Sequence, residues 1–294
     1  MFAMEFWMIR TFDHAGYYET RLILAAISLV AACYFAYYKP DRRFLLMFAS
    51  GAVLQTITEY VLLFRVLRTG DHSISVFNER IPSLIGPVVQ GFTEGGPLAM
   101  FAFWFADLRS SRARITHWLP WITLGVAIAV LSFVAGSVAR NQPIPSARPM
   151  FASLPIFTIT AVIFVSLFIA WRKDALSGLA NYYAGMLVFA VLSYEPLHLM
   201  GARYIGVLSN PPTGLQDAAQ FVAAPMPAQA VVMLLSHLYE AAGGKLHYFI
   251  IPFALGLVSL KEREYGVKRE RYSTQHLQDL AQRGWRKKSK PFTR

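Results

Sequence analysis

Charged residues and cysteine are both scarce in this sequence. Asp, Glu, Lys and Arg make up 15% of the 294 residues, whereas a soluble domain usually carries about a quarter. The single cysteine, Cys33, excludes an intrachain disulfide, a CxxC redox pair and a metal centre built on several thiolates. The shortage of charge argues against an ordinary soluble domain, and Cys33 is expected to pack as a small apolar residue.

Hydrophobic residues replace the missing charge. They form 55% of the chain, and four runs contain no charged side chain, namely 22–38, 44–58, 119–138 and 151–171. Such runs match the roughly 20 helical residues that cross a bilayer core, whereas membrane strands need about half that length and alternate in polarity. We therefore predict an all-α, polytopic membrane helical bundle with about seven transmembrane helices. The expected spans are 20–38, 43–64, 82–107, 116–138, 150–171, 178–200 and one crossing within 219–260.

Two of the expected spans contain residues that weaken a helix. Glu94 is flanked by Gly91, Gly95, Gly96 and Pro97, and a glycine pair occupies 243–244. Irregular backbone is tolerated in a membrane where it lines a cavity or is buried in protein. We expect one interrupted helix around 91–97 and another around 243–244. The second break also leaves open a pair of spans within 219–260, and therefore eight spans in total.

The distribution of positive charge distinguishes seven spans from eight. The net charge is +11, and residues 261–294 hold 11 Lys and Arg against 4 Asp and Glu. The short loops 39–43, 108–116 and 171–176 are also rich in Lys and Arg, which is typical of cytoplasmic loops. Seven spans place these loops and the tail on the same side. We predict a transmembrane domain, 1–260, with its N-terminus outside, and a basic cytoplasmic tail, 261–294, that is attracted to anionic lipid and not to nucleic acid.

Several ionisable residues lie inside the predicted spans, where an unpaired charge costs several kcal/mol. These residues are Glu59, Glu94, Glu195, His198, His237 and Glu240. In the seven-span topology they all fall between mid-membrane and the outer face, so we expect them to converge on one cavity. Glu59 and Glu94 are the candidate catalytic residues, as proton donor and acceptor. Outside this set, Asp107 is expected to form an ion pair with Arg109 at a helix end.

The spacing of the same residues also permits a metal site. Glu195 and His198 are three residues apart, as are His237 and Glu240, and such pairs share one face of an α-helix. Glu-x-x-His pairs, together with lone glutamates from other helices, ligate the metals of di-iron bundles. All six residues are therefore candidate ligands for iron or another divalent metal. Hydrogen-bonded Glu–His pairs and a tightly packed glycine-rich helix are the structural alternatives.

Three short motifs point to a known family. They are Gln55-Thr-Ile-Thr-Glu59, the run Gly96-Pro97-Leu98-Ala99 followed by aromatics up to Arg109, and Tyr248 one turn before Pro252. Together they resemble the second, third and last spans of the EXPERA family, which includes the sterol Δ8–Δ7 isomerases. Gln55 stands where that family has a histidine, and Val88 stands where it has a glutamate in its third span.

The resemblance implies isomerisation of a double bond in a sterol-like lipid. One acid would protonate the alkene, a second group would remove a proton, and an aromatic face would stabilise the carbocation. The candidate substrate-binding residues are Gln55, Trp104, Tyr194 and Tyr248.

The leading hypothesis is an integral membrane enzyme that acts on a lipid or isoprenoid through acid–base chemistry in the outer half of the bilayer. Its expected partners are membrane lipid and a hydrophobic small molecule. The first alternative is a di-metal oxidase, desaturase or hydroxylase that uses the same residues as ligands. The second is a transporter or a subunit of a membrane complex, which adds a membrane-protein partner.

Overall fold

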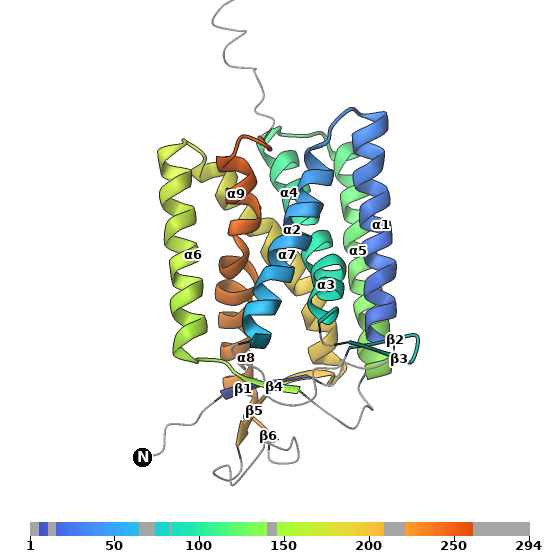
Figure 1. The fold of residues 1–294 in the computed structure, drawn as a ribbon, viewed down its shortest axis with the longest axis vertical. Coiled ribbons are helices and arrows are strands. Elements are labelled where there is room, and N and C mark those ends of the chain that lie inside the picture. The colour runs from blue at the N-terminus through green and yellow to red at the C-terminus, as the bar shows by residue number, and fades with distance from the viewer. Residues whose placement is uncertain are drawn as a thin grey trace, which may run out of the picture.

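The computed structural model describes residues 6–10, 16–64, 74–82, 84–139, 146–208 and 221–260. The predicted basic tail, 261–294, lies outside the described residues. Within them, helices dominate and run between the two ends of a bundle (Figure 1). Five helices are long and apolar enough to cross a membrane. They are α1 (Tyr17–Tyr38), α2 (Arg43–Phe64), α5 (Ile115–Ala139), α6 (Ser153–Arg172) and α7 (Leu176–Leu199).

Two further helical rods are built from several pieces, and both contain the predicted interruptions. The first consists of α3 (Gly86–Gln90), a π-helical segment (Gly91–Gly95) and α4 (Gly96–Ser110). The second consists of α8 (Met226–Leu235), a π-helical segment (Ser236–Ala242), a 3₁₀ turn (Gly243–Lys245) and α9 (His247–Ala254). π-Helical turns are rare and are frequently found at functional sites.

Short strands cover one end of the bundle, which corrects the all-α prediction. β1 (Phe6–Arg10), β4 (Ser146–Pro149), β5 (Arg203–Leu208) and β6 (Phe221–Ala223) form an antiparallel sheet in the order β4-β1-β5-β6. β2 (Ile74–Val76) and β3 (Glu79–Ile81) form a hairpin. These strands have three to six residues and, in the sheet, pair across long stretches of sequence, so no local periodicity reveals them. We call this end of the molecule the sheet end.

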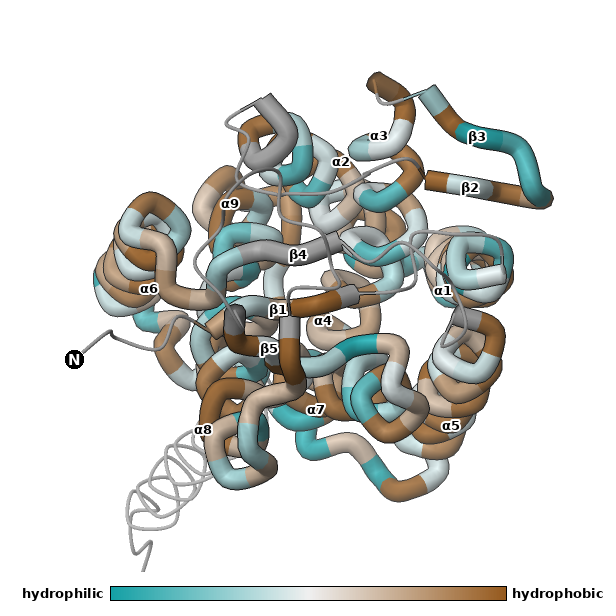
Figure 2. The backbone as a smooth tube through the Cα atoms, turned by 90° about the horizontal axis from the view of Figure 1, so that it is seen from below, coloured by the Kyte–Doolittle hydropathy of each residue, from teal (hydrophilic) through white to brown (hydrophobic). Residues whose placement is uncertain are grey.

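The core of the bundle is centred on α4. In this helix all residues from Gly96 to Leu108 are buried except Phe105, and α4 packs against α1, α2, α5 and α7. In the view from the sheet end, α4 lies in the middle and α6 at the periphery (Figure 2). Only Ser166 and Ala170 of α6 are buried. An apolar helix so exposed on nearly all sides is suited to a lipid environment.

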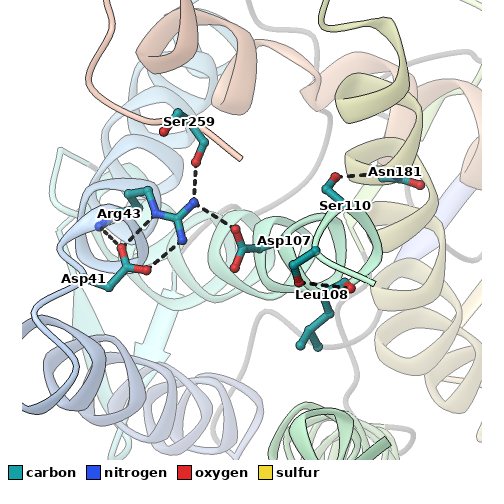
Figure 3. Close-up of polar contacts among 8 residues, drawn as sticks. Asp41, Arg43, Asp107, Leu108, Ser110, Asn181 and Ser259 are labelled. Atoms are coloured by element: carbon teal, nitrogen blue, oxygen red, sulfur yellow. Dashed lines mark hydrogen bonds and ion pairs between the residues drawn. The ribbon is translucent and has the colours of Figure 1, made fainter. Parts of the chain in front are cut away.

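The opposite end holds the short connections α1–α2, α4–α5 and α6–α7 together with the end of α9 (Figure 1); we call it the short-loop end. Here Arg43 of α2 bridges two carboxylates, with Nη2 2.7 Å from Asp41 Oδ2 and Nη1 2.8 Å from Asp107 Oδ1 (Figure 3). It also donates to the carbonyl of Ser259. The cation that meets Asp107 at 2.8 Å is therefore Arg43 and not the predicted Arg109, which is exposed two residues further along α4.

Candidate functional site

A cavity of about 590 Å³ lies between α2, α6 and the rod that runs from α8 to α9, and it extends to the sheet end. Most of the exposed wall is apolar, and a few polar side chains converge in it, as in ligand-binding pockets generally. The polar and aromatic lining residues include Gln55, Thr58, Glu59, Glu94, Thr158, Tyr194, Arg203, Ser236, Glu240, Lys245, His247 and Tyr248. Glu59, Glu94 and Glu240, from three different parts of the sequence, thus share one cavity.

The α2 wall of the cavity is organised around Gln55. Its Oε1 accepts hydrogen bonds from Lys245 Nζ at 3.1 Å and from the Tyr248 hydroxyl. Its Nε2 donates to Glu59 Oε1 at 2.6 Å, one helical turn away. Gln55, Glu59 and Tyr248 are all buried. Because two donors from the α8–α9 rod hold the amide oxygen, the amide nitrogen is directed at the Glu59 carboxylate, and this rod therefore helps to set the position of Glu59 on α2.

Glu94 enters the cavity from the π-helical segment Gly91–Gly95. This segment packs directly on α2 because its glycines have no side chains: a Cβ on Gly95 would lie 2.3 Å from the Gly51 carbonyl oxygen, and one on Gly91 2.3 Å from that of Ala52. Small residues at helix interfaces are the usual means of such close approach in membranes. The contact brings Glu94 against the turn of α2 that carries Gln55.

Two buried polar residues of α1, Tyr17 and Arg21, hold Glu94 in place. The Tyr17 hydroxyl donates to Glu94 Oε1 at 3.1 Å, and the Arg21 guanidinium lies 4.9 Å from the centre of the Tyr17 ring. Arg21 is itself buried and donates to Ser132 Oγ at 3.2 Å and to the Ser193 carbonyl at 3.3 Å. Tyr17 and Arg21 were not predicted as site residues. The available signal was an arginine four residues after a tyrosine at the start of an apolar run.

Glu240 lies in the second π-helical segment and accepts a hydrogen bond from Ser236 Oγ at 3.0 Å. Nearby on the cavity wall, the Arg203 guanidinium lies 4.6 Å from the centre of the Tyr194 ring. Arg203 belongs to β5, so the strand that closes the sheet end also contributes a cation to the cavity. Arg203, Lys245 and His247 are cavity residues that the sequence analysis did not select. Of these, Lys245 and His247 carried a visible signal, because both follow a glycine pair within an apolar segment.

The predicted histidine cluster does not line the cavity but lies behind its wall, with the ring centre of His237 6.1 Å from that of the lining residue Tyr194. His237 Nε2 is 3.4 Å from Glu195 Oε1, and its Nδ1 is 2.7 Å from the Met233 carbonyl oxygen. The ring centres of His198 and His237 are 6.5 Å apart. Glu195, His198 and His237 are not among the residues that line the cavity.

The six candidate metal ligands are not brought together. Throughout the described ranges, no group of three or more His, Cys, Asp or Glu side chains is placed to hold a metal ion. One reason is local, because His237 and Glu240 lie in a π-helical segment. A π-helix has more residues per turn than an α-helix, so residues three apart no longer share a face.

Trp104 is also outside the cavity. Its ring packs edge-on against Phe35 and Phe44, with ring centres 4.9 and 5.9 Å apart, in the aromatic core. Of the four predicted substrate-binding residues, Gln55, Tyr194 and Tyr248 line the cavity and Trp104 does not.

Comparison with known proteins gives no relative: no family model, curated protein or solved structure matches this chain.

Proposed function

We propose that this chain is an integral membrane enzyme that crosses the bilayer seven times and acts on a hydrophobic lipid or isoprenoid by acid–base chemistry. The proposal of seven crossings is supported by five helices that are long and apolar enough to cross a membrane and by two composite rods that would add two more. The short basic loops share the short-loop end, which by the positive-inside rule is cytoplasmic. The N-terminus and the cavity are then on the outer side, and the tail begins on the cytoplasmic side.

The observation that carries the proposal is a largely apolar cavity into which two glutamates project with different partners. Glu59 accepts from the Gln55 amide, and Glu94 accepts from the Tyr17 hydroxyl. Two carboxyl groups in different environments can divide the roles of acid and base. The resemblance to the EXPERA family supports the same chemistry at Gln55, Glu59 and Tyr248, which meet in the cavity, but not at Trp104.

The proposed reaction moves a double bond. A protonated glutamate donates its proton to one alkene carbon, the alkene π electrons form the new C–H bond, and the neighbouring carbon becomes a carbocation. The second glutamate, as carboxylate, removes a proton from the adjacent carbon, and that C–H bond pair forms the new double bond. The rings of Tyr194 and Tyr248 line the cavity and offer π faces to the cation. No oxidant or reductant is needed.

Solvent deuterium gives a direct test, because each turnover leaves one proton from the enzyme on carbon. Membranes that contain the protein are incubated in D₂O with a total lipid extract, and lipids are analysed by mass spectrometry. We expect one lipid class to gain carbon-bound deuterium, and Glu59→Gln and Glu94→Gln each to slow this by about 100-fold or more. The control is Glu195→Gln, at a glutamate outside the cavity, which should keep the wild-type rate.

Three results would contradict the proposal. If no lipid gains deuterium although lipid is bound, the protein is a lipid carrier or a structural subunit. If both Glu59→Gln and Glu94→Gln keep full activity, these two glutamates are not the catalytic residues. If stoichiometric iron or another divalent metal co-purifies and is lost with Glu94→Gln, the metal-dependent alternative replaces acid–base chemistry.

A further inference from the structure

The cavity shares part of its wall with the outward-facing surface of the bundle. Ile57 and Val61 of α2 both line the cavity, and each keeps 53% of its surface exposed. Across the cavity, Leu154 of α6 also lines it and is 46% exposed. These exposed lining residues lie on both α2 and α6, and within the described residues α2 and α6 are not among the helix pairs that pack closely against one another. The opening is therefore lateral, between α2 and α6, and its rim is apolar.

The arrangement of α6 is consistent with such an opening. This helix packs against α7, α9 and the 3₁₀ turn Gly243–Lys245, and it stands at the edge of the bundle in both views (Figures 1 and 2). At the sheet end, β1 and β5 lie across the bundle (Figure 2). Pro149 and Arg203 of the sheet line the cavity. The sheet thus covers the cavity on the side of the water, while the gap between α2 and α6 faces the lipid.

A polar anchor lies on the wall opposite the opening. Lys245 Nζ donates to Gln55 Oε1 at 3.1 Å, and an ammonium group has three donors. In the part of the chain that the structure describes, Gln55 is the hydrogen-bond partner found for Lys245, so two N–H groups can serve a ligand. These donors suit an oxygen atom, and the apolar rim suits a hydrocarbon chain.

We infer that the cavity takes an amphiphilic membrane lipid that enters sideways between α2 and α6 and places an oxygen-bearing polar end on Lys245. This assignment rests on the proposed function and names the substrate class and its orientation. The hydrocarbon part lies against Ile57, Val61 and Leu154, which leaves the chain continuous with the bilayer. The polar end lies beside Gln55 and Glu59. A purely hydrocarbon lipid would leave two of the three Lys245 N–H donors without an acceptor in a mostly apolar cavity, which is costly.

A pair of probes with the same chain tests the anchor. Oleyl alcohol carries one hydroxyl, and 9-octadecene has no oxygen. The full-length protein is placed in nanodiscs doped with either probe, and bound probe is counted by native mass spectrometry. We expect wild type to prefer the alcohol by about tenfold or more, as hydrogen bonds to charged groups allow, and Lys245→Met to remove that preference. Lys173→Met, at an exposed lysine near the short-loop end of α6, is the control and should retain it.

Tryptophan substitutions test the route. Val61→Trp on α2 and Leu154→Trp on α6 narrow the opening from its two sides and should each slow loading of oleyl alcohol by about tenfold. The matched controls are Val53→Trp and Phe157→Trp, at positions that are 56% and 72% exposed on the same helices but do not line the cavity. They should load at the wild-type rate. Two independent obstructing variants keep the test valid if one of them fails to fold.

The outcomes separate this inference from the proposed chemistry. An unchanged alcohol preference in Lys245→Met overturns the anchor, and unchanged loading in both obstructing variants overturns the lateral route, even if deuterium is still incorporated. Conversely, oleyl alcohol that binds as expected in wild type, with no lipid ever gaining deuterium, supports the binding mode and refutes the isomerase chemistry.

Discussion

Replacement of Arg43 by leucine should destabilise the fold more than any change on the exposed surface. The side chains of Arg43, Asp41 and Asp107 are only 14%, 8% and 11% exposed. Arg43 ties the start of α2 to the end of α4, and through the Ser259 carbonyl to the segment after α9 (Figure 3). Without the guanidinium, both poorly hydrated carboxylates lose the cation that bridges them.

The size of the expected loss in the free energy of unfolding follows from the burial of these three side chains. Removal of one partner from a fully buried ion pair costs about 3–5 kcal/mol, because the remaining charge is left without compensation. The three side chains here retain about a tenth of their exposure, so we expect about 2–4 kcal/mol. Arg43→Leu combined with Asp107→Asn removes one of the two carboxylates that lose this cation and should recover part of the lost stability, with a coupling of about 1–3 kcal/mol.

The assay is equilibrium unfolding of the purified protein in mixed detergent micelles. The control is Arg109→Leu, which replaces an exposed arginine in the last turn of α4, two residues after Asp107. Its free energy of unfolding should stay within about 0.5 kcal/mol of wild type. If Arg43→Leu unfolds no more easily than Arg109→Leu, or if the double variant shows no coupling, the bridge does not hold the short-loop end together.

Three other substitutions test the site. Gly95→Ala places a Cβ 2.3 Å from a backbone oxygen of α2, so it should lower the free energy of unfolding by about 1–3 kcal/mol. The control is Gly125→Ala, where the nearest atom to the new Cβ is the end of a flexible leucine side chain at 3.3 Å, and it should lower the free energy of unfolding less. Equal losses in the two variants would contradict the close packing of Gly95 on α2. Tyr17→Phe removes the hydroxyl that donates to Glu94 and should cost about 1.5–3 kcal/mol in unfolding; no loss would mean that the bond is unimportant. Lys245→Met should slow deuterium incorporation by about tenfold or more, and an unchanged rate would remove Lys245 from the site.

The helical framework was largely predictable from the sequence, because bilayer-length apolar runs leave a helix as the only way to pair every backbone group within one segment. The interruptions at 91–97 and 243–244 were also predicted, since glycine and proline weaken a helix wherever they occur. The sheet was not predictable. Its strands are short and their partners are distant in sequence, so their pairing depends on helices that first bring the loops to one end.

The candidate site was predicted in part. The cost of charge in a bilayer selected Glu59, Glu94 and Glu240, and all three line the cavity. Glu195, His198 and His237 were selected on the same ground but do not line the cavity, because a sequence gives depth in the membrane but not the direction in which a side chain points. The same argument passed over Arg21 and Arg203, since both stand near the ends of spans, where a solvated arginine is ordinary.

The sequence by itself determined that this chain is mainly apolar helix, where six of its seven predicted spans begin and end to within a few residues, and which ionisable groups are costly enough to suggest function. Those properties depend on local composition and on the thickness of a bilayer. Only the tertiary structure decided which groups share a cavity, that Lys245 and Gln55 organise one wall, and that the cavity opens between α2 and α6. Those properties depend on helix rotation, on π-helical turns and on close glycine contacts, which are set by packing between segments far apart in the chain.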